Sequence, residues 1–176
     1  MNAILQKLSG GNRTSLGRTN EVVAEILSSP SKFPALCDGL SSNDPVIRMR
    51  AADAIEKITV MRPELLAPYK RKLLALAVRE AQIEVRWHLA LMLPRLALTP
   101  RERAAAIDIL FDYLRDRSSI VKTHAMQGLA NLALKHPTLK AQIVPVVAEL
   151  TEIGTAAMRA RGRKLLPLLN RPSTTA

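Results

Sequence analysis

The chain has 176 residues, of which 48 % are apolar, only 3 % are aromatic and 7 are glycine, a mixture that favours packed helices over a β-sandwich. Its single cysteine, Cys37, excludes an intramolecular disulfide and a cysteine-rich zinc site. No apolar run reaches the roughly 18 residues of a membrane span, and the first residues show no signal-peptide pattern. We therefore expect a soluble, cytoplasmic protein without membrane insertion.

The formal net charge of +11 bears on the class of partner. Such a charge is compatible with binding to nucleic acid, to an anionic membrane surface or to an acidic protein. It is equally compatible with a solvated helical surface.

The two ends of the chain are expected to add little to the core. Residues 1–15 include the pair Gly10-Gly11 and are predicted to be flexible, as are residues 172–176. A helix within 18–30 is predicted to cap the N-terminal end of the fold.

Four stretches of the sequence superpose without gaps. They are IRMRAADAIEKI from Ile47, VRWHLALMLPRL from Val85, VKTHAMQGLANL from Val121 and MRARGRKLLPLL from Met158, at intervals of 38, 36 and 37 residues. In each stretch the first, fifth, ninth and twelfth residues are apolar or small, which places them on one stripe of an α-helix. The pattern predicts four equivalent helices that share a buried face.

A second set of helices is predicted between these four. Thr99 and Glu102 form a capping box around a proline at the first helical position. Asp44 and Thr155 are N-cap residues of repeated helices, and Gly154 is expected to end its helix in the left-handed conformation. The predicted helix pairs cover residues 31–60, 63–97, 100–135 and 138–170.

A helix pair at this period, with a second helix of the form V-R-x-x-A-x-x-x-L, resembles the HEAT repeat of the armadillo-type superfamily. The resemblance covers about residues 31–171. It implies an all-α fold, a right-handed α-solenoid of about four repeats whose second helices line a concave face. It also implies that the basic residue at the second position is structural, held by an acidic residue six positions earlier. Those positions hold Ser42, Glu80, Asp116 and Ile153, so the pairing fits Arg86 and Lys122 but not Arg48 or Arg159.

The only tryptophan, Trp87, is predicted to lie opposite the buried stripe, about 200° around the helical wheel from Val85. Two interpretations stay open. Trp87 either anchors a binding partner or lies flat between neighbouring helices and closes the groove between them. The apolar patch predicted on this concave face consists of Met49, Trp87, Ala90, Leu91, Pro94 and Met126.

A basic ridge is predicted beside the apolar patch. Each repeat contributes to it and none contributes an acid, which would suit phosphates or an acidic peptide. Lysine and arginine are also good helix formers that often lie at groove edges, so a solvated surface is the simpler alternative. The predicted ridge consists of Arg50, Lys57, His88, Arg95, His124, Asn131 and Arg161, with Arg163, Lys164 and Arg171 near its end.

The sequence contains no pattern typical of catalysis. It has no glycine-rich phosphate loop, no Ser-His-Asp arrangement and no pair of carboxylates on the predicted concave face. His88 and His124 are expected to lie roughly 10 Å apart, too far to share a metal ion. Some bacterial alkylpurine DNA glycosylases have similar HEAT-like helices, but the aspartate that they place one turn after a tryptophan is Leu91 here.

These observations predict a non-enzymatic HEAT-repeat adaptor without metal or cofactor. Its concave face is expected to bind an acidic or amphipathic protein partner. A nucleic-acid-binding module that contacts the phosphate backbone is the alternative.

Overall fold

The computed structural model describes residues 2–172, and these form α-helices and short 3-10 helices without a β-strand. The all-α prediction is therefore confirmed. None of these helices is both long and apolar enough to cross a membrane. The α-helices are α1 (Ala3–Leu8), α2 (Thr19–Ser28), α3 (Phe33–Cys37), α4 (Pro45–Met61), α5 (Lys70–Arg79), α6 (Ile83–Met92), α7 (Pro100–Tyr113), α8 (Ser119–Lys135), α9 (Lys140–Ile153) and α10 (Ala156–Leu169). The 3-10 helices are η1 (Pro30–Lys32), η2 (Asp38–Ser41), η3 (Pro63–Tyr69), η4 (Leu93–Arg95) and η5 (Pro137–Leu139).

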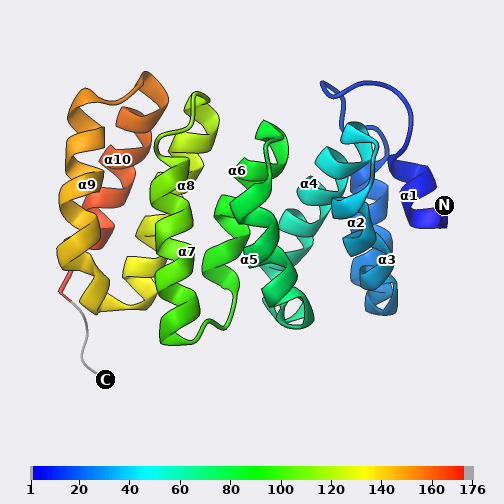
Figure 1. Ribbon diagram of the computed structural model, residues 1–176, viewed down its shortest axis with the longest axis horizontal. Helices are drawn as coiled ribbons and strands as arrows, with labels where there is room; N and C mark the ends of the chain where they lie inside the picture. The colour runs from blue at the N-terminus through cyan, green and yellow to red at the C-terminus, as the bar shows by residue number, and fades with distance from the viewer. Residues whose placement is uncertain (1, 173–176) are drawn as a thin grey trace. The chain divides into compact units, whose positions relative to one another are not determined.

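The chain divides into two compact units, Met1–Ala97 and Leu98–Ala176. The first unit contains α1 to α6 and the second contains α7 to α10 (Figure 1). Each unit has its own buried core, and each is described below by itself.

In the first unit, α4 is the central helix and packs against α1, α2, α3 and α6. Because neighbours lie on several sides of α4, most of its residues are buried, including Ile47, Ala51 and Ile55. Phe33 of α3 is also buried and meets the ring of Tyr69 edge to face, with ring centroids 5.8 Å apart. This contact joins the segment before α4 to the segment after it.

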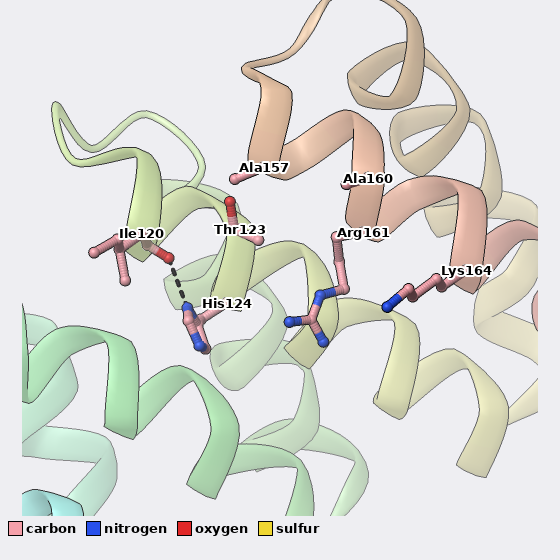
Figure 2. Close-up of a pocket in the computed structure, with 7 residues that line it drawn as sticks. All are labelled: Ile120, Thr123, His124, Ala157, Ala160, Arg161 and Lys164. Carbon is pink, nitrogen blue, oxygen red and sulfur yellow. Dashed lines mark hydrogen bonds between the residues drawn. The ribbon is translucent and has the colours of Figure 1, made fainter.

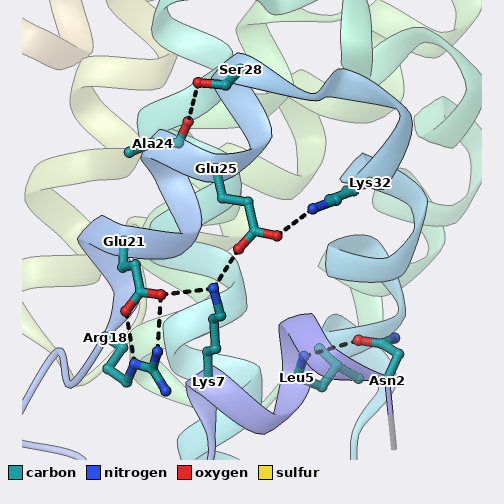
Figure 3. A network of polar contacts seen from close by, with 9 residues as sticks. All are labelled: Asn2, Leu5, Lys7, Arg18, Glu21, Ala24, Glu25, Ser28 and Lys32. Carbon is teal, nitrogen blue, oxygen red and sulfur yellow. Dashed lines mark hydrogen bonds and ion pairs between the residues drawn. The ribbon is translucent and has the colours of Figure 1, made fainter.

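The expectation that residues 1–15 are flexible is wrong for the segment that forms α1. Asn2 caps this helix by accepting a hydrogen bond from the Leu5 N–H, and Ile4 and Leu8 are buried. Lys7 holds α1 to α2 through ion pairs with Glu21 and Glu25 (Figure 3). Of the predicted C-terminal tail, residues 173–176 lie outside the described part of the chain.

In the second unit, α8 packs against α7, α9 and α10, and α10 also packs against α9. The close contact between α9 and α10 depends on Gly162. A β-carbon at this position would overlap the hydroxyl oxygen of Thr151, which donates a 2.6 Å hydrogen bond to the Val147 carbonyl. Glycine therefore allows these two helices to approach closely.

The repeated stripe forms the cores of both units. Of the four stripe positions in each repeated helix, all are buried except Leu166 of α10, which is partly exposed. The buried stripe residues are Ile47, Ala51, Ile55, Ile58, Val85, Leu89, Leu93, Leu96, Val121, Ala125, Leu129, Leu132, Met158, Gly162 and Leu169.

Several predicted helix ends are found in the structure. Thr99 and Glu102 form both hydrogen bonds of the capping box, and the side chains of Asp44 and Thr155 accept from N–H groups of the first turn. The prediction for Gly154 is wrong, because its φ of −71° is not left-handed. Glycine is needed there for space, since a β-carbon would collide with the carbonyl oxygen of Leu150.

Candidate binding groove between α8 and α10

The apolar patch predicted around Trp87 is not an exposed surface. Met49 and Met126 are 5 % and 0 % exposed, and Ala90 is fully buried. Met126 is covered by α10, since a β-carbon at Gly162 would lie 2.8 Å from its terminal methyl group. The remaining members differ: Pro94 is buried, whereas Trp87 and Leu91 are partly exposed.

Arg50, predicted in the basic ridge, is instead a buried residue of the first unit and only 2 % exposed. Its guanidinium donates hydrogen bonds to carbonyl oxygens at the end of α1 and in the loop between α1 and α2. Nη1 reaches the carbonyl oxygens of Leu8 and Gly10 at 2.9 and 2.8 Å, and Nε reaches that of Ser15 at 2.9 Å. The donors of this side chain are used within the fold, so Arg50 offers no contact surface.

The other ridge residues of the first unit are close to acidic side chains. Lys57 pairs with Asp53 at 2.7 Å, and Arg95 pairs with Glu56. His88 is buried, with Nε2 3.9 Å from a carboxylate oxygen of Asp53. The prediction of an acid-free ridge is therefore wrong for this unit.

The sequence contained a signal for these acids. Asp53 precedes Lys57 by four residues, a spacing that brings two side chains together on one helix. Glu56 gave no such signal, because its partner Arg95 comes from a different helical segment, 39 positions away.

In the second unit, a groove lies between α8 and α10, with a cavity of about 270 Å³ (Figure 2). The two helices run in the same direction (Figure 1), and each presents residues at helical spacings of three and four. The groove brings together His124 and Arg161, two of the predicted ridge residues. Its lining consists of Ile120, Thr123 and His124 from α8, and Ala157, Ala160, Arg161 and Lys164 from α10.

Hydrogen bonds fix the α8 side of the groove. Thr123 donates its hydroxyl to the Ser119 carbonyl at 2.7 Å. Nδ1 of His124 lies 2.8 Å from the Ile120 carbonyl oxygen. Because a carbonyl oxygen only accepts, Nδ1 is the donor of this hydrogen bond.

The α10 side supplies cations and small side chains. Arg161 donates from Nη1 to Oε1 of Gln127 at 2.8 Å, a neutral partner. Figure 2 shows the Arg161 guanidinium between the His124 ring and the Lys164 ammonium. Ala157 and Ala160 leave the space that forms the cavity.

The cations of α10 differ in their surroundings from the predicted ridge residues of the first unit. This helix carries Arg159, Arg161, Arg163 and Lys164 and no acidic residue. Within residues 2–172 none of the four has an ion pair, and Arg163 and Lys164 are exposed. Of the predicted ridge, the part on α10 is therefore the part whose cations lack acidic partners among the described residues.

The two basic residues without the expected acidic partner are held by carbonyl oxygens. Arg48 donates to the carbonyl of Ser42 at 2.8 Å and to the side chain of Gln82 at 2.9 Å. Arg159 donates to the Gly154 carbonyl at 3.1 Å. The backbone thus replaces the carboxylate, and Arg48 in particular is occupied within the fold.

Residues with metal or redox chemistry do not gather in this groove. Among residues 2–172, no group of three His, Cys, Asp or Glu side chains could hold a metal ion. Burial raises the pKa of the Cys37 thiol to about 12, so it stays protonated and unreactive at neutral pH.

Comparison with known proteins adds no family assignment. No protein-family model matches the chain, and neither a curated protein nor a solved structure does.

Proposed function

We propose that this protein is a non-enzymatic adaptor that binds an acidic segment of a partner protein in the groove between α8 and α10. The observation that carries the proposal is the pair Arg161 and Lys164, which line the groove without an acidic neighbour. Ile120, at 46 % exposure, adds apolar surface at the same place. Cations beside apolar surface suit a segment that is both acidic and partly apolar.

We also propose that the helix pairs are HEAT repeats, about four in number, forming a right-handed α-solenoid with α2 as N-terminal cap. The support is the stripe that recurs at 38, 36 and 37 residues and is almost wholly buried. An adaptor role fits such repeats, because they offer long surfaces without a deep catalytic pocket.

The experiment measures the affinity of a fluorescent, glutamate-rich peptide by anisotropy. Reversing both groove charges with Arg161→Glu and Lys164→Glu should weaken binding about tenfold or more, since attraction becomes repulsion. The control is Arg163→Glu on the same helix, which changes the net charge by half as much and does not line the groove. Equal losses in the control and the groove variant would refute a site in the groove.

Nucleic acid is the second candidate, favoured by the uncompensated cations of α10. The same anisotropy assay with a labelled duplex DNA distinguishes nucleic-acid binding from binding of an acidic protein segment. Contact with about five phosphates would give a log–log salt slope near −4.5. Binding of DNA with that slope, and not of the acidic peptide, would replace the adaptor proposal.

A further inference from the structure

The groove between α8 and α10 concentrates two permanent positive charges at one place. Arg161 and Lys164 lie three residues apart on α10 and line the same cavity. The other lining residues are Ile120, Thr123, His124, Ala157 and Ala160, none of them acidic. A ligand that neutralises this site needs about two negative charges.

The volume of the cavity limits which chemical groups can supply these two negative charges. Its volume of about 270 Å³ is small compared with the roughly 300–1,000 Å³ of sites that enclose drug-sized ligands. It accommodates one side chain more readily than two acidic side chains with their backbone. A phosphate monoester carries about −1.5 to −2 charges on one group at neutral pH, whereas a carboxylate carries only one.

The donors are also arranged for a group with several acceptor oxygens. Gln127 holds Nη1 of Arg161 through Oε1, and its own Nε2 donates to Oδ1 of Asn131 at 2.8 Å. This chain of hydrogen bonds positions the guanidinium, whose remaining N–H groups can form the paired contacts typical of arginine with phosphate. Lys164 adds a second cation beside it (Figure 2).

We infer that the groove recognises a phosphorylated serine or threonine side chain within the acidic partner segment. This inference rests on the proposed function and specifies the chemistry of the same site. The phosphoryl group lies between Arg161 and Lys164, and the methyl groups of Ala157 and Ala160 leave room for it. Ile120 contacts the apolar part of the segment at the edge of the groove.

The test compares three short peptides that share an acidic sequence and differ at one central residue, which is serine, glutamate or phosphoserine. Isothermal titration to the full chain should rank phosphoserine above glutamate by about tenfold, because a dianion forms more charge-assisted hydrogen bonds. The serine peptide should bind most weakly.

Three groove variants and one control variant locate the effect. Arg161→Ala and Lys164→Ala should each reduce the preference for phosphoserine over glutamate, whereas Arg163→Ala should keep it. Ala160→Leu fills the cavity without changing charge, and should also reduce the preference while leaving the helical circular dichroism unchanged.

The outcomes separate this inference from the proposed function. Equal affinity for the phosphoserine and glutamate peptides would overturn the inference and leave an acidic-segment groove in place. Failure of all three peptides to bind the wild-type chain would overturn both. A preference for phosphoserine that survives in Arg161→Ala, Lys164→Ala and Ala160→Leu would overturn the location of the phosphate site.

Discussion

Arg50 is a charged side chain in the core of the first unit whose partners are backbone carbonyls at the end of α1 and in the loop between α1 and α2. The loop fits closely around it. Gly17 has a φ of +51°, and a β-carbon there would lie 2.8 Å from the guanidinium carbon. Arg50 thus ties a segment more than thirty residues away to α4.

Replacing Arg50 should destabilise the first unit. Arg50→Met removes the donors and leaves partly buried carbonyl groups without partners, so the free energy of unfolding should fall by about 3 kcal/mol. Urea denaturation measures the change. Arg163→Met, at an exposed site without a hydrogen bond or ion pair within residues 2–172, is the control and should stay within about 0.5 kcal/mol. An Arg50→Met protein as stable as the wild type would contradict this role.

The ridge prediction failed at Arg50 and Arg95 for a physical reason. A helical wheel shows which residues of one helix share a face, but not which residues of another segment meet them. The partners of Arg50 lie in an irregular loop, and Glu56 reaches Arg95 from a different helix. The helical-wheel prediction holds for His124 of α8 and Arg161 of α10, which line one groove. These two helices run in the same direction, so equivalent wheel positions face the same side.

Helix ends could be predicted from the sequence better than contacts between helices, because a cap depends on residues close in sequence. The Thr99 and Glu102 box could be predicted from four consecutive residues and is present. A proline inside a helix removes one backbone hydrogen bond, and at Pro94 helix α6 gives way to the 3-10 segment η4. Pro167, at the equivalent repeat position, lies inside α10 without ending it. A proline at this repeat position therefore does not by itself decide whether the helix ends.

The α9–α10 pair should be sensitive to one added methyl group. Alanine is favoured over glycine in a helix by about 1 kcal/mol, but a β-carbon at Gly162 overlaps Thr151. Overpacking costs about 1–3 kcal/mol, and this overlap is severe, so Gly162→Ala should lower the free energy of unfolding by about 2 kcal/mol net. Thermal or urea unfolding measures the change.

A second substitution tests the cause. Adding Thr151→Ala to Gly162→Ala removes the overlapping hydroxyl and should recover part of the loss, which a double-mutant cycle detects. Complete additivity of the two substitutions would show that the assigned contact is not responsible.

The docking of α1 on α2 should depend on pH. Hydrogen bonds from Arg18 and then Lys7 lower the pKa of Glu21 from 4.5 to about 2 (Figure 3). A carboxyl group whose pKa falls on folding stabilises the folded state above its unfolded pKa, and this stabilisation is lost as pH falls from about 4.5 to about 2. Hydrogen exchange of the α1 amides should therefore become less protected over that window, relative to the amides of α4.

Glu21→Gln provides the control for this pH dependence. Because glutamine does not titrate, the variant should lose much of the change in α1 protection between those pH values, while Glu25 retains its part. The same change in the variant as in the wild type would assign the effect to other groups.

At the scale of the whole chain, net charge alone does not locate a binding surface. Residues 1–97 hold 14 basic and 9 acidic residues, and residues 98–176 hold 12 and 6. The excess is similar in the two units. In the first unit the ridge residues Arg50, Lys57 and Arg95 contact acids or carbonyl oxygens. Arg161 and Lys164 of α10 have no ion pair among residues 2–172. Composition is compatible with an anionic partner, and the structure indicates which cations are available to it.

Salt should weaken the proposed complex. Raising the ionic strength from about 0.1 M to about 1 M shortens the Debye length from about 10 Å to about 3 Å. The affinity for the glutamate-rich peptide should consequently fall by about tenfold, because Arg161 and Lys164 lie at an open groove. A salt-independent affinity would indicate a mainly apolar contact elsewhere.

The most direct measurement is an amide NMR titration of the isotopically labelled chain with the glutamate-rich peptide. We predict that the largest shift changes map to the groove between α8 and α10, including Ile120, Ala160, Arg161 and Lys164. Changes confined to residues 2–97, for example at the Trp87 indole, with the groove signals unmoved, would contradict the assignment of this groove as the partner-binding site.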